Sequence, residues 1–236
     1  VDRVVLHSDA QQKIFLNGFD SKFTTLIRMG CGAPLPLDGV EDMRRKLGLT
    51  DGSPIIGSFG FLRDQKGFHI IAKAIQGLRT KYPTMLFFIV SPEHVFGSKE
   101  YDDRFYRFIR NEGMQDFIKI YREFLPEDEV VKTLQCADLF VMNYEDAPYG
   151  GGVSAAVKTV MRTQRPIIVS QSIAFSDLDQ EVAWLPDRKP ETIASAIDQV
   201  ISNPELQKQL VTTASQYVEQ HSWDQTAKEY LHVYRT

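Results

Sequence analysis

The chain has 236 residues, of which 43% are hydrophobic and 25% are charged, and this is the composition of an ordinary globular protein. Its length allows one large domain, or one domain with part of a second. The formal net charge of −4 provides no basic excess, so nucleic acid is a poor candidate partner, and no apolar run is long enough to span a bilayer. Cys31 and Cys136 have no metal-ligand spacing and fit a reducing compartment such as the cytoplasm.

The first residues are predicted to form a small unit of their own. Val4–His7 and Thr25–Ile27 have the pattern of strands, and Gln11–Asn17 has that of a helix. The stretch Gly30–Pro36 is rich in glycine and proline and is typical of a linker. The expected division is an appendage over residues 1–36 and a main domain over residues 37–236.

Short apolar runs that suit strands buried on both faces recur through the middle of the chain. They are Pro54–Phe59, Met85–Val90, Phe117–Tyr121, Leu139–Met142 and Pro166–Ser170. Helical patterns separate them, from Phe68 to Leu78, over Tyr101–Arg110 and over Glu127–Leu134. This alternation of strand and helix predicts an α/β fold with a Rossmann-like, doubly wound parallel sheet.

The last fifty residues are predicted to be helical only. Pro190 and Pro204 each stand at the start of a helical pattern, which is a favoured place for proline. A third pattern follows Ser222 and carries apolar residues up to Tyr234. We expect this last helix to pack against the appendage at the start of the chain. The apolar side chains there need cover, and the last helix offers apolar side chains of its own: Val4, Leu6, Ile14 and Phe15 on the appendage, and Ala227, Leu231 and Tyr234 on the helix.

The loop between the last two apolar runs of the middle region is rich in glycine. Gly150–Gly152 allow backbone N–H groups to converge, and a helix is expected to begin near Val153 and Ser154. Such a junction suits a phosphate or another anion. It is also compatible with a tight turn that binds nothing, because it is not a Walker or Rossmann fingerprint.

Several segments resemble those of a known family and occur in the same order along the chain. Ile56–Gly67 resembles the strand, loop and helix start of the nucleotide-sugar-binding C-terminal domain in GT-B fold glycosyltransferases of family 4, the glycosyl transferases group 1. Cys136–Met142 is similar to a strand of that family, and the segment from Trp184 to Tyr230 is similar to its closing helices. The resemblance covers essentially the whole chain, with residues 1–36 matching the end of the N-terminal domain and the hinge.

The resemblance implies the donor-binding half of a retaining, metal-independent glycosyltransferase that moves a sugar from a nucleotide-sugar to an unknown acceptor. The nucleotide-sugar is then a substrate, and neither a cofactor nor a metal is expected. The acceptor-binding domain would precede Val1, so we expect this isolated fragment to be inactive. The implied location is the cytoplasm, or the periphery of a membrane through the missing part.

The expected site joins two loops that follow two parallel strands. Lys66 stands at a helix start after a loop with Gly60, and Arg63 lies three residues before it, so both can reach a diphosphate. By resemblance, the loop with Phe124 and Leu125 would meet the base. The predicted donor-binding residues are Gly60, Arg63, Lys66, Phe124, Leu125, Tyr144, Gly150, Gly151, Gly152, Val153, Ser154 and Thr159. We expect Gly60, Lys66, Phe124 and Gly151 to line one crevice.

The chain departs from the family pattern at two acids. Many members carry paired glutamates at positions that fall on Gly151 and Thr159 here, where the second acid holds ribose hydroxyls. Thr159 can still hydrogen-bond a hydroxyl, but it does so without charge. Tyr144 and the glycines before Val153 resemble a subset of the family that has a small-residue loop at this point.

Two other functions stay open from the sequence. Loss of the paired acids favours a non-catalytic scaffold or partner-binding domain, whereas retention of Arg63 and Lys66 opposes it. A hydrolase or epimerase would need a carboxylate at the crevice. The nearby carboxylates are Glu145, Asp146, Asp177 and Asp179, and we interpret the last two as a solvated turn.

Overall fold

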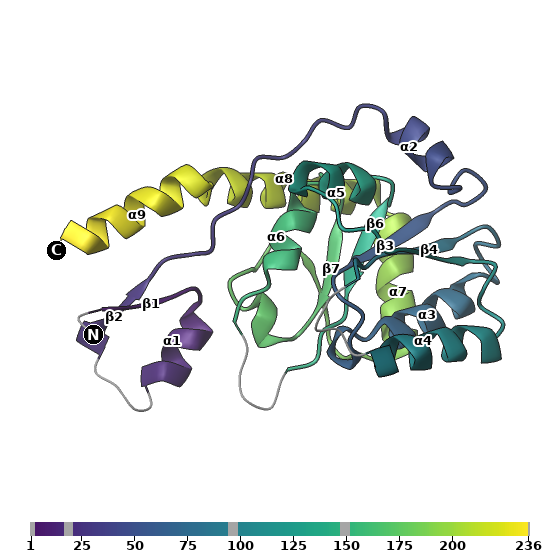
Figure 1. Cartoon of the computed structure of the whole chain (residues 1–236), viewed down its shortest axis with the longest axis horizontal. Helices are drawn as coiled ribbons and strands as arrows, with labels where there is room; N and C mark the ends of the chain where they lie inside the picture. The colour runs from purple at the N-terminus through teal and green to yellow at the C-terminus, as the bar shows by residue number, and fades with distance from the viewer. Residues whose placement is uncertain (1–2, 17–20, 94–98, 147–151, 236) are drawn as a thin grey trace.

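Six parallel strands form the main sheet in the computed structural model, which describes residues 3–16, 21–93, 99–146 and 152–235 (Figure 1). The spatial order is β5-β4-β3-β6-β7-β8, and every neighbouring pair is parallel. The strands are β3 (Ile55–Phe59), β4 (Leu86–Val90), β5 (Ile118–Tyr121), β6 (Leu139–Met142), β7 (Ile167–Ser170) and β8 (Ala183–Leu185). The predicted doubly wound α/β class is confirmed.

Helices cover both faces of this sheet. On one face α3 packs against α7, and α4 joins them through a contact between Phe68 and Phe105. On the other face α6 packs against α5 and α8. The helices of the two layers are α3 (Phe68–Leu78), α4 (Lys99–Asn111), α7 (Pro190–Ile201), α5 (Glu127–Leu134), α6 (Ala155–Met161) and α8 (Pro204–Gln220).

The core explains why the apolar runs became strands. Every residue of β4, β6 and β7 is buried, as expected for strands covered by helices on both sides. The inward face of α3 adds Phe68, Ile71, Ile75 and Leu78 at helical spacing. Burial of side chains of this size stabilises the fold by about 1.5–3 kcal/mol each.

The strand order reverses between β3 and β6. The chain runs outward from β3 to β4 and β5, and then returns to the other side of β3 with β6, β7 and β8. A doubly wound sheet has a crevice at this switch point, outside the carboxyl ends of the two central strands. The topology therefore places the loops after β3 and β6 together.

A separate two-stranded sheet lies near the start of the chain. It pairs β1 (Val4–Leu6) with β2 (Thr24–Leu26) in parallel, and α1 (Asp9–Leu16) packs against it. The last helix, α9 (Trp223–Arg235), extends from the main body toward this unit (Figure 1). A shallow groove between them is lined by Leu26 and Ile27 on one side and by residues of α9 on the other. The division at residue 36 stays a prediction.

The predicted cover of the appendage is wrong in its details. The side chain of Ile14 is 57% exposed, and on α9 Leu231 and Tyr234 are 49% and 76% exposed, so they do not shield one another. β2, rather than α1, lies along α9. Where the chain crosses between the two parts, Cys31 pairs in parallel with Ser222.

The linker from Cys31 to Pro36 is fastened to the main domain. The Arg162 guanidinium donates to the carbonyl of Ala33 at 2.8 Å and pairs with carboxylates at the start of α5. The side-chain amides of Gln135 and Gln164 both donate to the carbonyl of Leu35, at 2.9 and 2.7 Å. The linker is therefore fixed to the main domain, because side chains of that domain donate hydrogen bonds to its backbone carbonyls.

One α-helix and one strand among the described residues were not expected from the sequence. One is α2 (Val40–Lys46), a short helix with no buried residue, and the other is the three-residue strand β8. Neither has enough apolar periodicity to be recognised alone.

Candidate functional site

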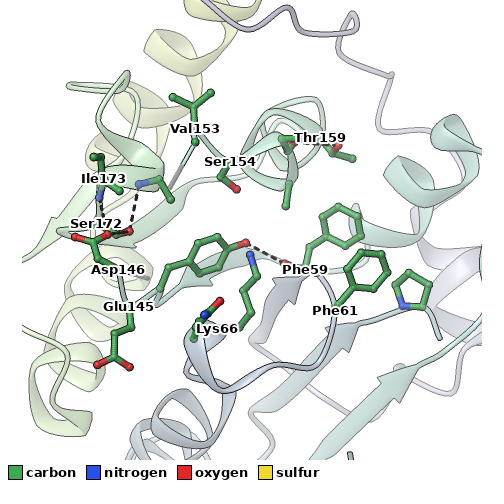
Figure 2. Close-up of a pocket in the computed structure, with 18 residues that line it drawn as sticks. Phe59, Phe61, Lys66, Glu145, Asp146, Val153, Ser154, Thr159, Ser172 and Ile173 are labelled. Carbon is green, nitrogen blue, oxygen red and sulfur yellow. Dashed lines mark hydrogen bonds between the residues drawn. The ribbon is translucent and has the colours of Figure 1, made fainter. Parts of the chain in front are cut away.

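A pocket of about 510 Å³ lies at the switch point, beside the carboxyl ends of β3 and β6 (Figure 2). Its walls come from the loops after β3, β4, β6 and β7 and from the first turn of α6. Among the residues predicted from the sequence, Gly60, Lys66, Tyr144, Gly152, Val153, Ser154 and Thr159 line it.

The loop after β3 presents Lys66 to this pocket. Gly60 adopts a φ of +128°, which favours glycine, and lets the chain turn away from the sheet. A single 3₁₀ turn over Asp64–Lys66 follows, and Gly67, in the left-handed region, starts α3. This turn of the loop brings the Lys66 side chain to the wall of the pocket.

The ammonium of Lys66 lies over the ring of Tyr144, with 3.4 Å between Nζ and the ring centroid. This is a cation–π contact. Burial, with the nearby charge of Arg63 adding to it, lowers the pKa of Lys66 to about 8. The amine is therefore still mostly charged at neutral pH, although it is incompletely solvated, and such a group gains most from an anionic ligand.

Tyr144 forms the floor of the pocket at the end of β6. Its ring packs against Phe175 with 4.8 Å between centroids, and its hydroxyl donates to the carbonyl of Phe59 at 3.4 Å. The Ser170 hydroxyl donates to the Tyr144 carbonyl at 2.7 Å. Burial raises the pKa of Tyr144 above its usual range, so the phenol is neutral. Tyr144 thus acts as a fixed platform.

The opposite wall is the start of α6. The Ser154 side chain caps this helix by accepting from the N–H of Val157, and its own N–H donates to the carbonyl of Ala174 at 2.8 Å. Thr159 lies one turn further along and faces the same pocket. The β7 loop therefore fixes where α6 begins.

Two carboxylates follow Tyr144, and both have partners. Asp146 Oδ1 accepts from the Ser172 hydroxyl at 2.6 Å and from the N–H of Ile173 at 2.8 Å. Glu145 pairs with Arg188 at 3.2 Å and points away from Asp146 (Figure 2). Asp146 is a positioned group in the pocket wall, although the sequence predicted it only as a carboxylate near the crevice and not as a donor-binding residue.

Some predicted site residues do not line this pocket. Arg63 is exposed, and Phe124 is 79% exposed on the loop after β5, two strands away from β3. Leu125 follows on the same loop. The expectation that Phe124 shares one crevice with Lys66 is not met by the described pocket, and a role in donor binding stays a prediction for all three. Gly150 and Gly151 lie outside the described residues.

The pocket also includes residues that were not among the predicted donor-binding residues. They are Phe59, Phe61, Gln65, Pro92, Glu145, Asp146, Ala155, Ala156, Ser172, Ile173 and Ala174. Pro92 follows β4, and Ser172 follows β7. A search of the positions just after each central strand would have found most of them.

Asp177 is not in a solvated turn, which corrects the interpretation from the sequence. Its side chain is fully buried and pairs with Lys158 of α6 at 2.7 Å, while Tyr217 of α8 donates to the same oxygen at 2.9 Å. Asp179 is exposed, as expected. One of the two carboxylates is thus buried in an ion pair and the other is exposed.

Within the described ranges, no group of three or more histidine, cysteine or carboxylate side chains is arranged to hold a metal ion. Among the described helices, none combines the length and the apolar character needed to cross a membrane.

Comparison with known proteins identifies relatives. The family model for glycosyl transferases group 1 matches residues 39–217. The chain is 23% identical over 245 aligned residues to D-inositol 3-phosphate glycosyltransferase of Corynebacterium urealyticum, and the match covers 100% of this chain and 57% of that protein. It thus spans little more than half of that curated relative's length.

Solved structures show the same fold. The Anabaena protein Alr3699/HepE, solved in complex with UDP and glucose, superposes with a TM-score of 0.85 at 16% identity, over 100% of this chain and 63% of that one. A glycosyltransferase from Rickettsia africae gives a TM-score of 0.84 at 16% identity, over 99% and 63%. These likenesses establish the architecture.

Proposed function

This chain belongs to the glycosyl transferases group 1 family, and on that premise we propose that it is the donor-binding half of a retaining, metal-independent GT-B glycosyltransferase of family 4. In this proposal residues 37–236 hold a nucleotide-sugar, and an acceptor-binding domain precedes them. The reaction moves the sugar to an acceptor that is not identified. The proposed setting is the cytoplasm, or the periphery of a membrane reached through the preceding domain.

The observation that carries the proposal is the position of Lys66 across one pocket from Gly152 and Ser154. A diphosphate needs cations and hydrogen-bond donors around it. Lys66 supplies a charge that is only partly solvated, and the loop before α6 supplies backbone and hydroxyl groups. The UDP complex of the structurally similar Anabaena protein supports a nucleotide as the ligand.

The remaining predicted residues receive roles that fit this ligand. Thr159 would hydrogen-bond a ribose hydroxyl from the wall of α6. Phe124 and Leu125 would meet the base, and Arg63 would add positive charge beside Lys66. Gly150 and Gly151 would complete the glycine-rich loop. No residue is assigned as catalytic.

The chemistry assigned to this half is stabilisation of the leaving group. When the bond from the anomeric carbon to the phosphate oxygen breaks, negative charge develops on the nucleoside diphosphate. A pre-positioned Lys66 lowers the energy of that charge, in the role that a metal ion takes in other enzymes. Transfer would still require the acceptor domain, which also excludes water, so we expect none from residues 1–236 alone.

Calorimetric titration of the 236-residue chain with UDP and with GDP, each with and without EDTA, tests the proposal. We expect binding that EDTA does not change. Lys66→Ala should weaken it by about one to two decades, because a charge-assisted contact of this kind contributes about 1.5–3 kcal/mol. Lys208→Ala, an exposed lysine of α8 outside the pocket, is the matched control and should change nothing.

Two other outcomes of this titration would contradict the proposal in whole or in part. If neither nucleotide binds at millimolar concentration, the chain is a scaffold or partner-binding domain and the proposal is wrong. If binding disappears with EDTA, a metal takes part and the metal-independent mechanism is wrong.

A further inference from the structure

Asp146 is the carboxylate that the pocket holds in a fixed orientation. Its Oδ1 accepts two hydrogen bonds, from the Ser172 hydroxyl at 2.6 Å and from the N–H of Ile173 at 2.8 Å. Both donors belong to the loop after β7, so a second strand of the sheet fixes a side chain that comes from the loop after β6. Two such bonds leave the carboxylate little rotational freedom.

The side chain of Asp146 is exposed, and one of its oxygens takes no part in these two bonds. Asp146 Oδ2 accepts no hydrogen bond from the part of the chain that the structure describes, and Asp146 lines the pocket. A carboxylate oxygen accepts only, and it forms short, strong bonds with hydroxyl donors. The group is therefore suited to a neutral molecule with several hydroxyls.

Charge separates two regions of the pocket. Lys66 lies on the side of the loop after β3, whereas Asp146 lies with Ser172 and Ile173 on another side of the cavity (Figure 2). A diphosphate is attracted to the ammonium and repelled by the carboxylate. A ligand that carries both a diphosphate and a polyol would therefore place its polyol toward Asp146.

We propose that Asp146 binds hydroxyl groups of the donor sugar and helps to determine which sugar the pocket accepts. This assignment rests on the proposed function, because it takes the ligand to be a nucleotide-sugar. Neighbouring Glu145 is paired with Arg188 at 3.2 Å, and its side chain points away from Asp146 (Figure 2).

The test compares ligands with and without the sugar. Affinities of the 236-residue chain for UDP, UDP-glucose, GDP and GDP-mannose are measured by calorimetry, for the unmodified protein and for Asp146→Asn. The asparagine Oδ1 can still accept from Ser172 and Ile173, so the loop should keep its structure. We expect the affinity for the nucleotide-sugar that binds best to fall about tenfold, while that for its nucleoside diphosphate stays within about threefold.

Two further variants separate recognition from a loss of structure. Ser172→Ala keeps the carboxylate but removes one of its anchors, and it should weaken nucleotide-sugar binding by about threefold without affecting the nucleoside diphosphate. Glu181→Gln changes another loop carboxylate that accepts a backbone N–H, from Asp179 at 2.6 Å, outside the pocket. It should change no affinity.

Each remaining result counts against the inference. Equal losses for both kinds of ligand, or no loss for either, would overturn the role of Asp146 while the nucleotide site stands. If the unmodified chain binds none of the four ligands, the proposed function is wrong and the inference falls with it.

Discussion

The ammonium of Lys66 lies 3.4 Å from the centre of the Tyr144 ring, although the two residues belong to loops that follow different strands. The ring is itself fixed, by Phe175 beneath it and by a hydrogen bond to the carbonyl of Phe59. Tyr144 therefore positions the cation before any ligand arrives. Pre-positioning reduces the entropy that a flexible lysine loses on binding.

Removing the ring should weaken nucleotide binding. We expect Tyr144→Leu to lower the affinity for UDP or GDP by about three- to tenfold, the range that a partly buried cation–π contact supports. Tyr144→Phe keeps the ring and should stay within about twofold of the unmodified protein. Equal losses in both variants would show that the hydroxyl, rather than the ring, positions Lys66. Calorimetry at one pH measures all three proteins.

Nucleotide affinity should also depend on pH through Lys66. Its pKa is lowered to about 8 by burial and by Arg63, so the charged form that binds phosphate is lost as pH rises through that value. We expect the dissociation constant to rise about tenfold between pH 7.5 and pH 9.5, since each unit above the pKa removes most of the remaining charge. In Lys66→Arg the guanidinium stays charged, and the dependence over this range should vanish.

A glycine at the start of α3 is required by the shape of the loop. Gly67 has a φ of +64°, and an added Cβ would lie 2.6 Å from the backbone oxygen of Asn143, which cannot easily move. Gly67→Ala should therefore reduce the free energy of unfolding by about 2–4 kcal/mol. Gly77, near the end of the same helix, has open space around it, and Gly77→Ala should raise it by about 0.5 kcal/mol. Urea denaturation measures both, and similar effects at the two positions would contradict this explanation.

The sequence predicted the central fold well, because each strand of the doubly wound sheet is itself an apolar run. Leu139–Met142 was predicted with its observed bounds, and the helices that begin at Pro190 and Pro204 have local start signals. The short helix α2 was missed because it buries nothing, and β8 because three residues carry no period. The pattern of apolar residues therefore predicts a helix or strand only where that element buries a face.

The site was predictable to the extent that topology determines it. Lys66 and Ser154 lie on loops that a switch point must bring together, so a parallel sheet alone implies that they meet. The role of Asp146 depends on a hydroxyl 26 residues further along the chain, and no local pattern encodes such a pair. The same reason explains Asp177. Its partners, Lys158 and Tyr217, lie on two different helices, and only the packed structure distinguishes it from an ordinary loop carboxylate.

The buried cluster of Lys158, Asp177 and Tyr217 should respond to single substitutions far more strongly than a surface pair does. Lys158 and Asp177 are 2.7 Å apart with side chains 4% and 0% exposed, so removal of either partner leaves a charge without compensation. We expect Lys158→Met to reduce the free energy of unfolding by about 3–5 kcal/mol, because it leaves the buried Asp177 carboxylate without its charge partner. Lys158→Met with Asp177→Leu should recover part of this loss, and the part that remains comes from the buried Tyr217 hydroxyl, which loses both of its hydrogen-bond partners. Arg45→Met, which breaks the exposed pair of Arg45 with Asp42 at 2.9 Å, is the control and should change the stability by less than about 1 kcal/mol. Urea denaturation of the four proteins decides the matter, and a double variant as unstable as Lys158→Met alone would mean that packing, rather than the unpaired charge, causes the loss.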